Sequence, residues 1–209
     1  FEELGTRLGV SRTHAWRLHQ RALKRLRTLL LNQPEVRERM NMEPTWNAAA
    51  MEALVGIALF EDDWPEGNPD YPLADAVSDV TAEIEAAIRN LQNGYEMDAV
   101  RTLTNAAEYA VAYLRCVGQW SLLNQHQLLC SKQNDYGHGN ILKFGMTGVM
   151  VRASDKSERL KNLTIGRDIA PRNESLLDTF FDVIGYTVIA VMLKAETFEL
   201  PLDREALIV

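Results

Sequence analysis

The chain has 209 residues, of which 46% are hydrophobic and 24% are charged, and its formal net charge is −7. This is the composition of a globular protein, and it excludes a disordered or low-complexity chain. Two cysteines are too few for a disulfide framework or a four-thiolate zinc site. The chain opens with a charged helical pattern rather than a signal peptide, and its apolar stretches are interrupted or short. We therefore expect a cytoplasmic protein with no membrane partner.

The charge is distributed unevenly along the chain. Residues 1–27 carry a net charge of +5, residues 28–100 carry −12, and residues 101–209 are neutral. Blocks of different charge suggest segments with different partners.

Helical periodicity dominates the chain, because apolar residues recur at spacings of three and four and almost no segment alternates as a strand does. The expected helices are 2–8, 12–31, 47–60, 73–92, 96–115, 117–133, 148–163 and 174–195. Thr45 can cap the third helix, Asn93 and Gly94 form a turn before the fifth, and Asn173 can cap the last.

These patterns predict an all-α protein in three parts. A small helix-turn-helix unit covers residues 1–33, and an acidic linker with one helix covers 34–72. A larger helical domain, such as a bundle, covers 73–209.

The basic N-terminal unit has the pattern of a DNA-binding helix-turn-helix. Leu4 and Leu8 form the inner face of a short helix, Gly9 provides the tight turn, and Ser11 caps the second helix. The residues predicted to contact DNA are Arg12, Thr13, His14, Trp16, Arg17 and Arg21. The alternative is a packing or oligomerisation appendage with this shape and no DNA contact.

Three runs in this unit resemble a known family. They are Glu3-Leu4-Gly5, Leu8-Gly9-Val10-Ser11-Arg12 and Ala22-Leu23-Lys24-Arg25-Leu26-Arg27, and they are similar to the helix-turn-helix of bacterial sigma factor region 4. The resemblance implies a helix-turn-helix fold and contact with DNA through residues 1–27.

The C-terminal half carries a glycine-bracketed loop after an expected helix, and such loops often hold ligand contacts. The candidate residues at this helix–loop junction are Lys132, Asp135, Tyr136, His138 and Asn140. They are candidates for phosphate contact, base or sugar contact, and general acid–base catalysis.

A polar stripe follows on the next expected helix. Arg152, Asp155, Arg159 and Asn162 share one face. The apolar face opposite is expected to hold Met150, Val151, Leu160 and Leu163. Guanidinium groups bind phosphate and carboxylates hold Mg²⁺, which predicts a phosphate and metal site. An Asp155–Arg159 ion pair on a solvent-exposed face explains the stripe equally well.

Three acids lie on the last expected helix at a spacing of four: Glu174, Asp178 and Asp182. Their neighbours are apolar nearly all round, so the helix is expected to be buried, and buried carboxylates need a cation. Asp178 and Asp182 are therefore expected to face a metal or an arginine. Asp75, Asp79 and Glu83 have the same spacing on an amphipathic helix, where a solvated face is expected.

Three blocks of the C-terminal half resemble a phage and bacterial family, the nucleotide modification-associated domain 1. They follow one another in the same order as in that family, over roughly residues 115–195. The blocks are Lys132…Asp135-Tyr136-Gly137…Asn140, Arg152…Asp155-Lys156…Arg159-Leu160…Asn162-Leu163 and Asp178…Asp182…Tyr186. The family is helical and is associated with phage nucleotide metabolism or DNA modification. In arrangement the family is similar to MazG-type and dUTPase-type nucleotide pyrophosphohydrolases, so the resemblance implies a MazG-like domain. If the protein is encoded by a phage, the resemblance also implies that it is located in the cytoplasm of the bacterial host.

The leading hypothesis is a Mg²⁺-dependent protein, an enzyme or a binding protein, that takes a (deoxy)nucleotide and forms a homo-oligomer. The metal would be held by Asp155, Glu174, Asp178 and Asp182. The phosphates would be held by Lys132, Arg152 and Arg159, the base or sugar by Tyr136 and Asn140, and Asp135 would be the general base.

Two alternatives stay open. In the first, the chain is a non-enzymatic regulator that uses its helix-turn-helix on DNA or on transcription machinery. Its C-terminal domain would then be a degenerate sensing or dimerisation module. In the second, the acidic middle segment mimics DNA.

Overall fold

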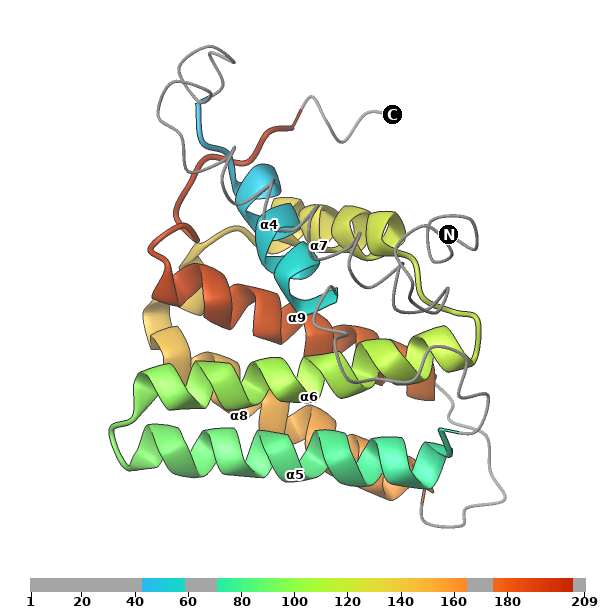
Figure 1. Cartoon of the computed structure of the whole chain (residues 1–209). Coiled ribbons are helices and arrows are strands. Elements are labelled where there is room, and N and C mark those ends of the chain that lie inside the picture. The colour runs from blue at the N-terminus through green and yellow to red at the C-terminus, as the bar shows by residue number, and fades with distance from the viewer. Residues whose placement is uncertain (1–42, 59–70, 165–174, 205–209) are drawn as a thin grey trace, which may run out of the picture. The chain divides into compact units, whose positions relative to one another are not determined.

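A computed structural model describes residues 43–58, 71–164 and 175–204 of the chain. Within these ranges there are six helices and no strand (Figure 1). The helices are α4 (Trp46–Ala58), α5 (Leu73–Gln92), α6 (Glu96–Cys116), α7 (Leu122–Tyr136), α8 (Gly139–Thr164) and α9 (Leu176–Lys194). The predicted all-α class is confirmed for this part of the chain. The predicted helix-turn-helix over residues 1–33, with its DNA-binding residues, lies outside the described residues.

Helices α5, α6, α9 and α8 pack in that cyclic order as a four-helix bundle (Figure 1). α5 and α6 are joined by the predicted turn at Asn93 and Gly94. α6 and α9 are antiparallel, because Glu96 pairs with Lys194 at one end and Tyr113 stacks on Phe180 towards the other. The bundle therefore alternates in direction from one helix to the next.

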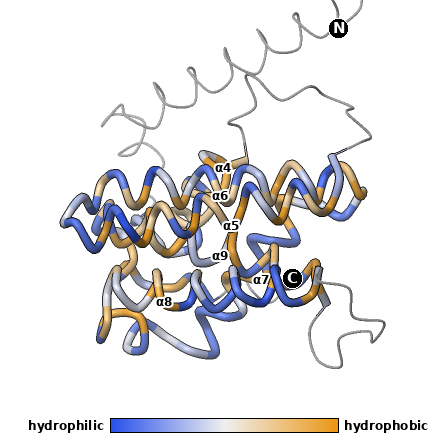
Figure 2. The backbone as a smooth tube through the Cα atoms, turned by 90° about the horizontal axis from the view of Figure 1, so that it is seen from below, coloured by the Kyte–Doolittle hydropathy of each residue, from blue (hydrophilic) through white to orange (hydrophobic). Residues whose placement is uncertain are grey.

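The core of the bundle follows the apolar stripes of its helices, which alternate with hydrophilic positions along the chain (Figure 2). On α5 the predicted stripe is confirmed, since Val77, Val80 and Ile84 are buried. α9 contributes Phe180, Ile184 and other fully buried residues, because it packs against four neighbouring helices. Burial of such side chains stabilises the fold by about 1.5–3 kcal/mol each.

Among the described helices, α9 is the one that is long and apolar enough to cross a membrane, with a mean hydropathy of 1.8. From the sequence no membrane-spanning helix was expected, because the apolar stretches of the chain are interrupted by polar residues or are short. The core helix of a bundle satisfies the same test of length and composition, so the finding is weak evidence for a membrane span.

Helix α4 was predicted as part of the linker segment, yet it packs on α7, α9 and α6. Its first turn is capped as predicted, because Thr45 Oγ1 accepts a hydrogen bond of 3.3 Å from the backbone N–H of Ala48. Trp46 and Leu54 are completely buried against the rest of the domain. α4 is therefore a structural member of the helical domain.

The boundaries of α7, α8 and α9 differ from the predicted ones, because local capping decides them. α7 begins at Leu122 with Ser121 as its cap, not at residue 117. α9 begins at Leu176 and is capped by Ser175, so the predicted cap at Asn173 is wrong.

Helix α8 starts at Gly139, nine residues before the predicted start, and is kinked. Gly145 interrupts its helical geometry with φ 53° and ψ −141°, a conformation that favours glycine. A Cβ atom at Gly148 would lie 2.6 Å from Cβ of Phe144. The two glycines therefore permit a short turn of helix to bend into the long segment that packs in the bundle.

Candidate functional site

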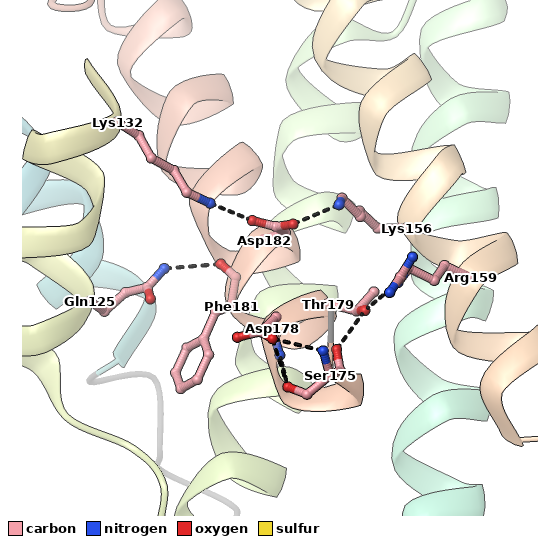
Figure 3. Close-up of polar contacts among 9 residues, drawn as sticks. All are labelled: Gln125, Lys132, Lys156, Arg159, Ser175, Asp178, Thr179, Phe181 and Asp182. Carbon is pink, nitrogen blue, oxygen red and sulfur yellow. Dashed lines mark hydrogen bonds and ion pairs between the residues drawn. The ribbon is translucent and has the colours of Figure 1, made fainter. Parts of the chain in front are cut away.

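Three helices meet at the carboxylate of Asp182. Lys132 of α7 donates to Oδ1 at 2.7 Å, and Lys156 of α8 lies 2.6 Å from Oδ2 (Figure 3). Both α7 and α8 pack on α9, so the two lysines reach Asp182 from neighbouring helices. Asp182 was expected to face a metal or an arginine, and its partners are two lysines.

The Asp182 carboxylate stays ionised in this setting. Its side chain is 12% exposed, and this burial alone raises its pKa. The hydrogen bonds and charges of Lys132 and Lys156 outweigh the burial and hold the pKa below its ordinary value. Lys156 is itself only 17% exposed, whereas Lys132 is 45% exposed. Lys132 is thus the more accessible of the two cations.

Arg159 lies one turn beyond Lys156 on α8 and binds the first turn of α9. Its Nε donates to Oγ1 of Thr179 at 3.2 Å, and this hydroxyl donates to the carbonyl of Ser175 at 3.3 Å (Figure 3). Thr179 is completely buried. The hydroxyl therefore fixes the guanidinium beside the start of α9.

Lys132, Lys156, Arg159 and Asp182 are called the cationic cluster below. Two lysines bind one ionised carboxylate, and Arg159 lies one turn further along α8. The helices behind it are packed with apolar side chains, and charges act more strongly where water is partly excluded. The exposed ammonium group of Lys132 can offer the cluster's N–H donors to an anion.

Asp178 has a structural partner inside its own helix turn. Its Oδ2 accepts hydrogen bonds from the backbone N–H and the hydroxyl of Ser175, at 2.7 Å and 2.8 Å (Figure 3). The Ser175 hydroxyl oxygen in turn accepts from the N–H of Asp178, which completes a capping box. Asp178 is exposed, not buried as expected, because the free N–H groups of a helix start offer it a local partner.

The described carboxylates do not fit a magnesium ion. Both oxygens of Asp182 bind lysines, Asp178 caps α9, and Asp155 is exposed on α8. Among the described residues, no group of three His, Cys, Asp or Glu side chains is arranged to hold a metal. Glu174, the fourth predicted ligand, lies outside the described ranges.

The predicted loop residues lie at the end of α7 and the start of α8. Asp135 and Asn140 are exposed, and Tyr136 is 73% exposed. His138 differs from them, because its ring packs edge-on against Phe198 at 5.5 Å between centroids. Its Nε2 is buried and makes no hydrogen bond. The loop therefore presents an aromatic side chain to solvent and anchors its histidine in the domain.

Lys156 and Gln125 were missed by the sequence interpretation. Gln125 is buried and donates through Nε2 to the carbonyl of Phe181 at 2.9 Å, beside the cationic cluster (Figure 3). Lys156 lies three residues before Arg159, a helical spacing that places both on one face.

The predicted apolar face of α8 is confirmed at Met150 and Leu160, which are buried, and is wrong at Val151. Its buried residues are Val149, Met150, Ala153, Ser157 and Leu160. Val151, expected in the apolar face, is 56% exposed. Arg152 and Asp155 therefore point away from the bundle, and Lys156 and Arg159 lie beside α9 instead.

His126 and Cys130 are packed into the structure and are not a nucleophilic pair. His126 Nε2 lies 2.8 Å from the carbonyl of Asn47, so this nitrogen carries the proton and donates it there. Cys130 Sγ is 3.5 Å from the same nitrogen. Burial raises the pKa of the Cys130 thiol to about 11, which disfavours the reactive thiolate.

Three acids on α5 have the same spacing as the acids on α9, and two of them are less solvated than expected. Asp79 accepts a 2.7 Å hydrogen bond from the hydroxyl of Tyr71, and Glu83 accepts one of 3.2 Å from Asn105. Asp75 is exposed as expected. The same spacing of acids thus leads to tyrosine and asparagine partners on α5, and to serine and lysine partners on α9.

Comparisons with protein-family models, with curated proteins and with solved structures found no match for this chain. The two family resemblances seen in the sequence therefore stay predictions. What the site binds has to be inferred from its own charges, distances and exposure.

Proposed function

We propose that the helical domain binds a phosphate-bearing small molecule of the nucleotide class at the cationic cluster. The observation that carries this proposal is the pair of lysines on the Asp182 carboxylate, of which Lys132 is 45% exposed. Lysine and arginine are the side chains that bind phosphate oxygens, the first as a point charge and the second through paired N–H donors. A phosphomonoester carries between one and two negative charges at neutral pH, and its oxygens accept hydrogen bonds from such donors.

Lys132 is the side chain best placed to meet the ligand from solvent. An ammonium group has three N–H donors, and the structure records one acceptor for that of Lys132, the carboxylate of Asp182. Asp182 therefore holds the lysine in position before the ligand arrives and leaves donors for a phosphate oxygen.

Tyr136 favours a nucleotide over a bare phosphate. It follows Lys132 by four residues on α7, so both lie on one face of the helix. Its ring is 73% exposed, and an exposed aromatic ring near a cation can stack a base whose phosphate the cation binds.

The proposal is limited to binding. The predicted hydrolysis depends on Mg²⁺, and the described carboxylates provide no fitting set of ligands for it. No catalytic step is assigned to the exposed Asp135 for the same reason.

The proposal is tested by calorimetric titration of the whole chain with a deoxynucleoside, its monophosphate, diphosphate and triphosphate, and inorganic phosphate. Each titration is run with and without Mg²⁺. We expect the phosphorylated compounds to bind and the unphosphorylated nucleoside to bind far more weakly.

The matched variants are Lys132→Ala, Lys156→Ala and the control Lys161→Ala. Lys161 lies on α8 but pairs with Glu85 and Glu158, away from the cluster. Loss of one charged hydrogen bond of about 1.5–3 kcal/mol lowers affinity roughly tenfold or more for the first two variants. If the wild-type chain binds none of the phosphates, or if Lys161→Ala weakens binding as much, the proposal is wrong.

A further inference from the structure

One end of the four-helix bundle brings together the turn between α5 and α6, the last turn of α9 and the start of α8 (Figure 1). Glu96, the first residue of α6, pairs with Lys194, the last residue of α9, at 3.4 Å. Tyr95 and Met97, on either side of Glu96, are 61% and 65% exposed. Two large apolar side chains therefore lie in solvent near the end of α9.

The kinked start of α8 lies at the same end of the bundle. α8 is antiparallel to α9, and its Lys156 pairs with Asp182. Eleven residues lead back along α8 from Lys156 to Gly145, and eleven lead on along α9 from Asp182 to Leu193. Both stretches of helix are about 16 Å long at 1.5 Å per residue. The kink at Gly145 is therefore level with the last turn of α9.

Two more apolar side chains, Leu142 and Phe144, precede this kink and are 39% and 58% exposed. Phe144 packs over Gly148, where a Cβ atom would lie 2.6 Å from that of Phe144. The position of this exposed aromatic residue is thus fixed by the kink. Tyr95, Met97, Leu142 and Phe144 are called the end patch below. Exposed apolar groups of this kind, gathered at one place, are typical of interaction surfaces.

Two charged side chains of opposite sign accompany the end patch. Lys143 is exposed, and its Nζ lies 5.4 Å from the centre of the Phe144 ring. Glu196 is exposed just beyond the end of α9. In the part of the chain that the structure describes, neither side chain makes an ion pair. The protomer therefore leaves one cation and one anion unused at this end.

Glu196 occupies a backbone position where glycine is usual. Its N–H donates to the carbonyl of Leu193 at 3.1 Å, and that of Thr197 donates to the carbonyl of Met192 at 2.9 Å. These two bonds form the helix-ending motif that places its next residue in the left-handed region, and the φ of Glu196 is 57°. A residue other than glycine is strained there, and such strain is often kept for a function. The side chain of Glu196 is therefore a candidate for a contact outside the protomer.

We infer that a second copy of this chain packs on the end patch around a two-fold axis. In a two-fold interface each residue meets its counterpart's partner twice, so Lys143 of each copy would face Glu196 of the other. The apolar side chains of the end patch would pack between these two ion pairs. The surface is complementary to itself, because it carries one charge of each sign that the protomer does not use. This inference goes beyond the proposed function and does not rest on it.

The test measures the association of the whole chain by sedimentation equilibrium and native mass spectrometry. Lys143→Glu would bring two carboxylates together at both contacts, and Glu196→Lys would bring two ammonium groups together. Each variant should associate at least about tenfold more weakly than wild type, because like charges across an interface repel. The matched control is Asp155→Lys, which makes the same charge change at an exposed site ten residues beyond the kink of α8. It should associate as the wild type does.

Mixing the two charge-reversal variants separates contacts between chains from contacts within one chain. In a mixed dimer of Lys143→Glu with Glu196→Lys, both contacts again join opposite charges. We expect this dimer to form with an affinity close to that of wild type, although neither variant associates well with itself. An ion pair within one chain could not be restored by mixing.

Two further variants keep the inference testable if a charge reversal does not fold. Phe144→Ala removes the exposed ring and should also weaken association. Glu196→Gly removes the carboxylate and relieves the backbone, since glycine adopts a positive φ freely. It should therefore keep or raise the unfolding temperature of the chain and still weaken association.

A wild-type chain that stays monomeric at micromolar concentration would overturn the inference. An oligomer that none of these variants weakens would place the contact on another surface and would overturn it too. Weakened association without recovery in the mixture would contradict the two-fold arrangement. If a monomeric wild type instead floats with anionic vesicles and Phe144→Ala does not, the end patch binds a membrane and the inference is wrong.

Discussion

Lys132 and Lys156 come from different helices and bind opposite oxygens of one carboxylate, that of Asp182. The carboxylate links α7 and α8 to α9 and also sets the charge of the candidate site. The ion pairs of Asp182 therefore contribute to stability and limit anion binding at the same time. Neutralising Asp182 should therefore lower the stability of the fold while it keeps or strengthens anion binding.

Asp182→Asn should lower the free energy of unfolding by about 1–3 kcal/mol, because Lys132 and the largely buried Lys156 lose their charged partner. The same change removes the negative charge of the carboxylate between the two lysines, so nucleotide affinity should be kept or increased. Urea denaturation and calorimetry measure the two effects. Asp155→Asn, at an exposed position on α8, is the control and should be nearly neutral. A loss of nucleotide affinity in Asp182→Asn, seen only with Mg²⁺, would indicate a metal ligand instead.

The stability supplied by Asp182 should depend on pH in a defined direction. Burial raises its pKa, but the two lysines lower it further, so the folded value lies below the ordinary 3.8. Between the two values the unfolded chain holds more protons than the folded one. The contribution is thus present above the ordinary pKa and is lost as the pH falls through the folded one. Urea titrations from about pH 6 to about pH 3 should show that the wild type and Asp182→Asn become more alike in their free energy of unfolding as the pH falls. A difference that stays constant over this range would contradict the assignment.

The α8 kink predicts contrasting effects of two glycine substitutions. Gly148→Ala would bring a Cβ to 2.6 Å from Cβ of Phe144, so it should lower stability by about 1–3 kcal/mol. Gly56→Ala on α4 meets no atom within 4 Å and should raise stability by about 0.4–1 kcal/mol. Thermal and urea unfolding of the two variants measures this. Equal effects would show that the Gly148–Phe144 contact does not restrict the kink.

The two cysteines should differ in reactivity in the folded protein. Cys130 is buried and its thiol pKa is raised to about 11, whereas Cys116 is partly exposed. A rise of about two units leaves roughly a hundredfold less thiolate at neutral pH, before access is considered. Alkylation followed by mass spectrometry should therefore modify Cys116 first. The order should disappear in urea, where both thiols are exposed, and prior modification of Cys130 in the native state would contradict its burial.

Periodicity alone predicted much of the described scaffold. The apolar stripe of α5 at Val77, Val80 and Ile84 and the turn at Asn93 both follow from local preferences. Local rules act over a few residues, so they can be recognised without knowing what packs against the helix.

Tertiary packing decided which side chains meet in the candidate site. A spacing of four places Asp178 and Asp182 on one face of α9, yet one caps the helix and the other binds two lysines. The sequence determined that this part of the chain is all-α and that a polar face on α9 needs partners. Only the packing of α7 and α8 on α9 decided that Lys156 is one of them, because helical periodicity specifies a face but not its neighbour.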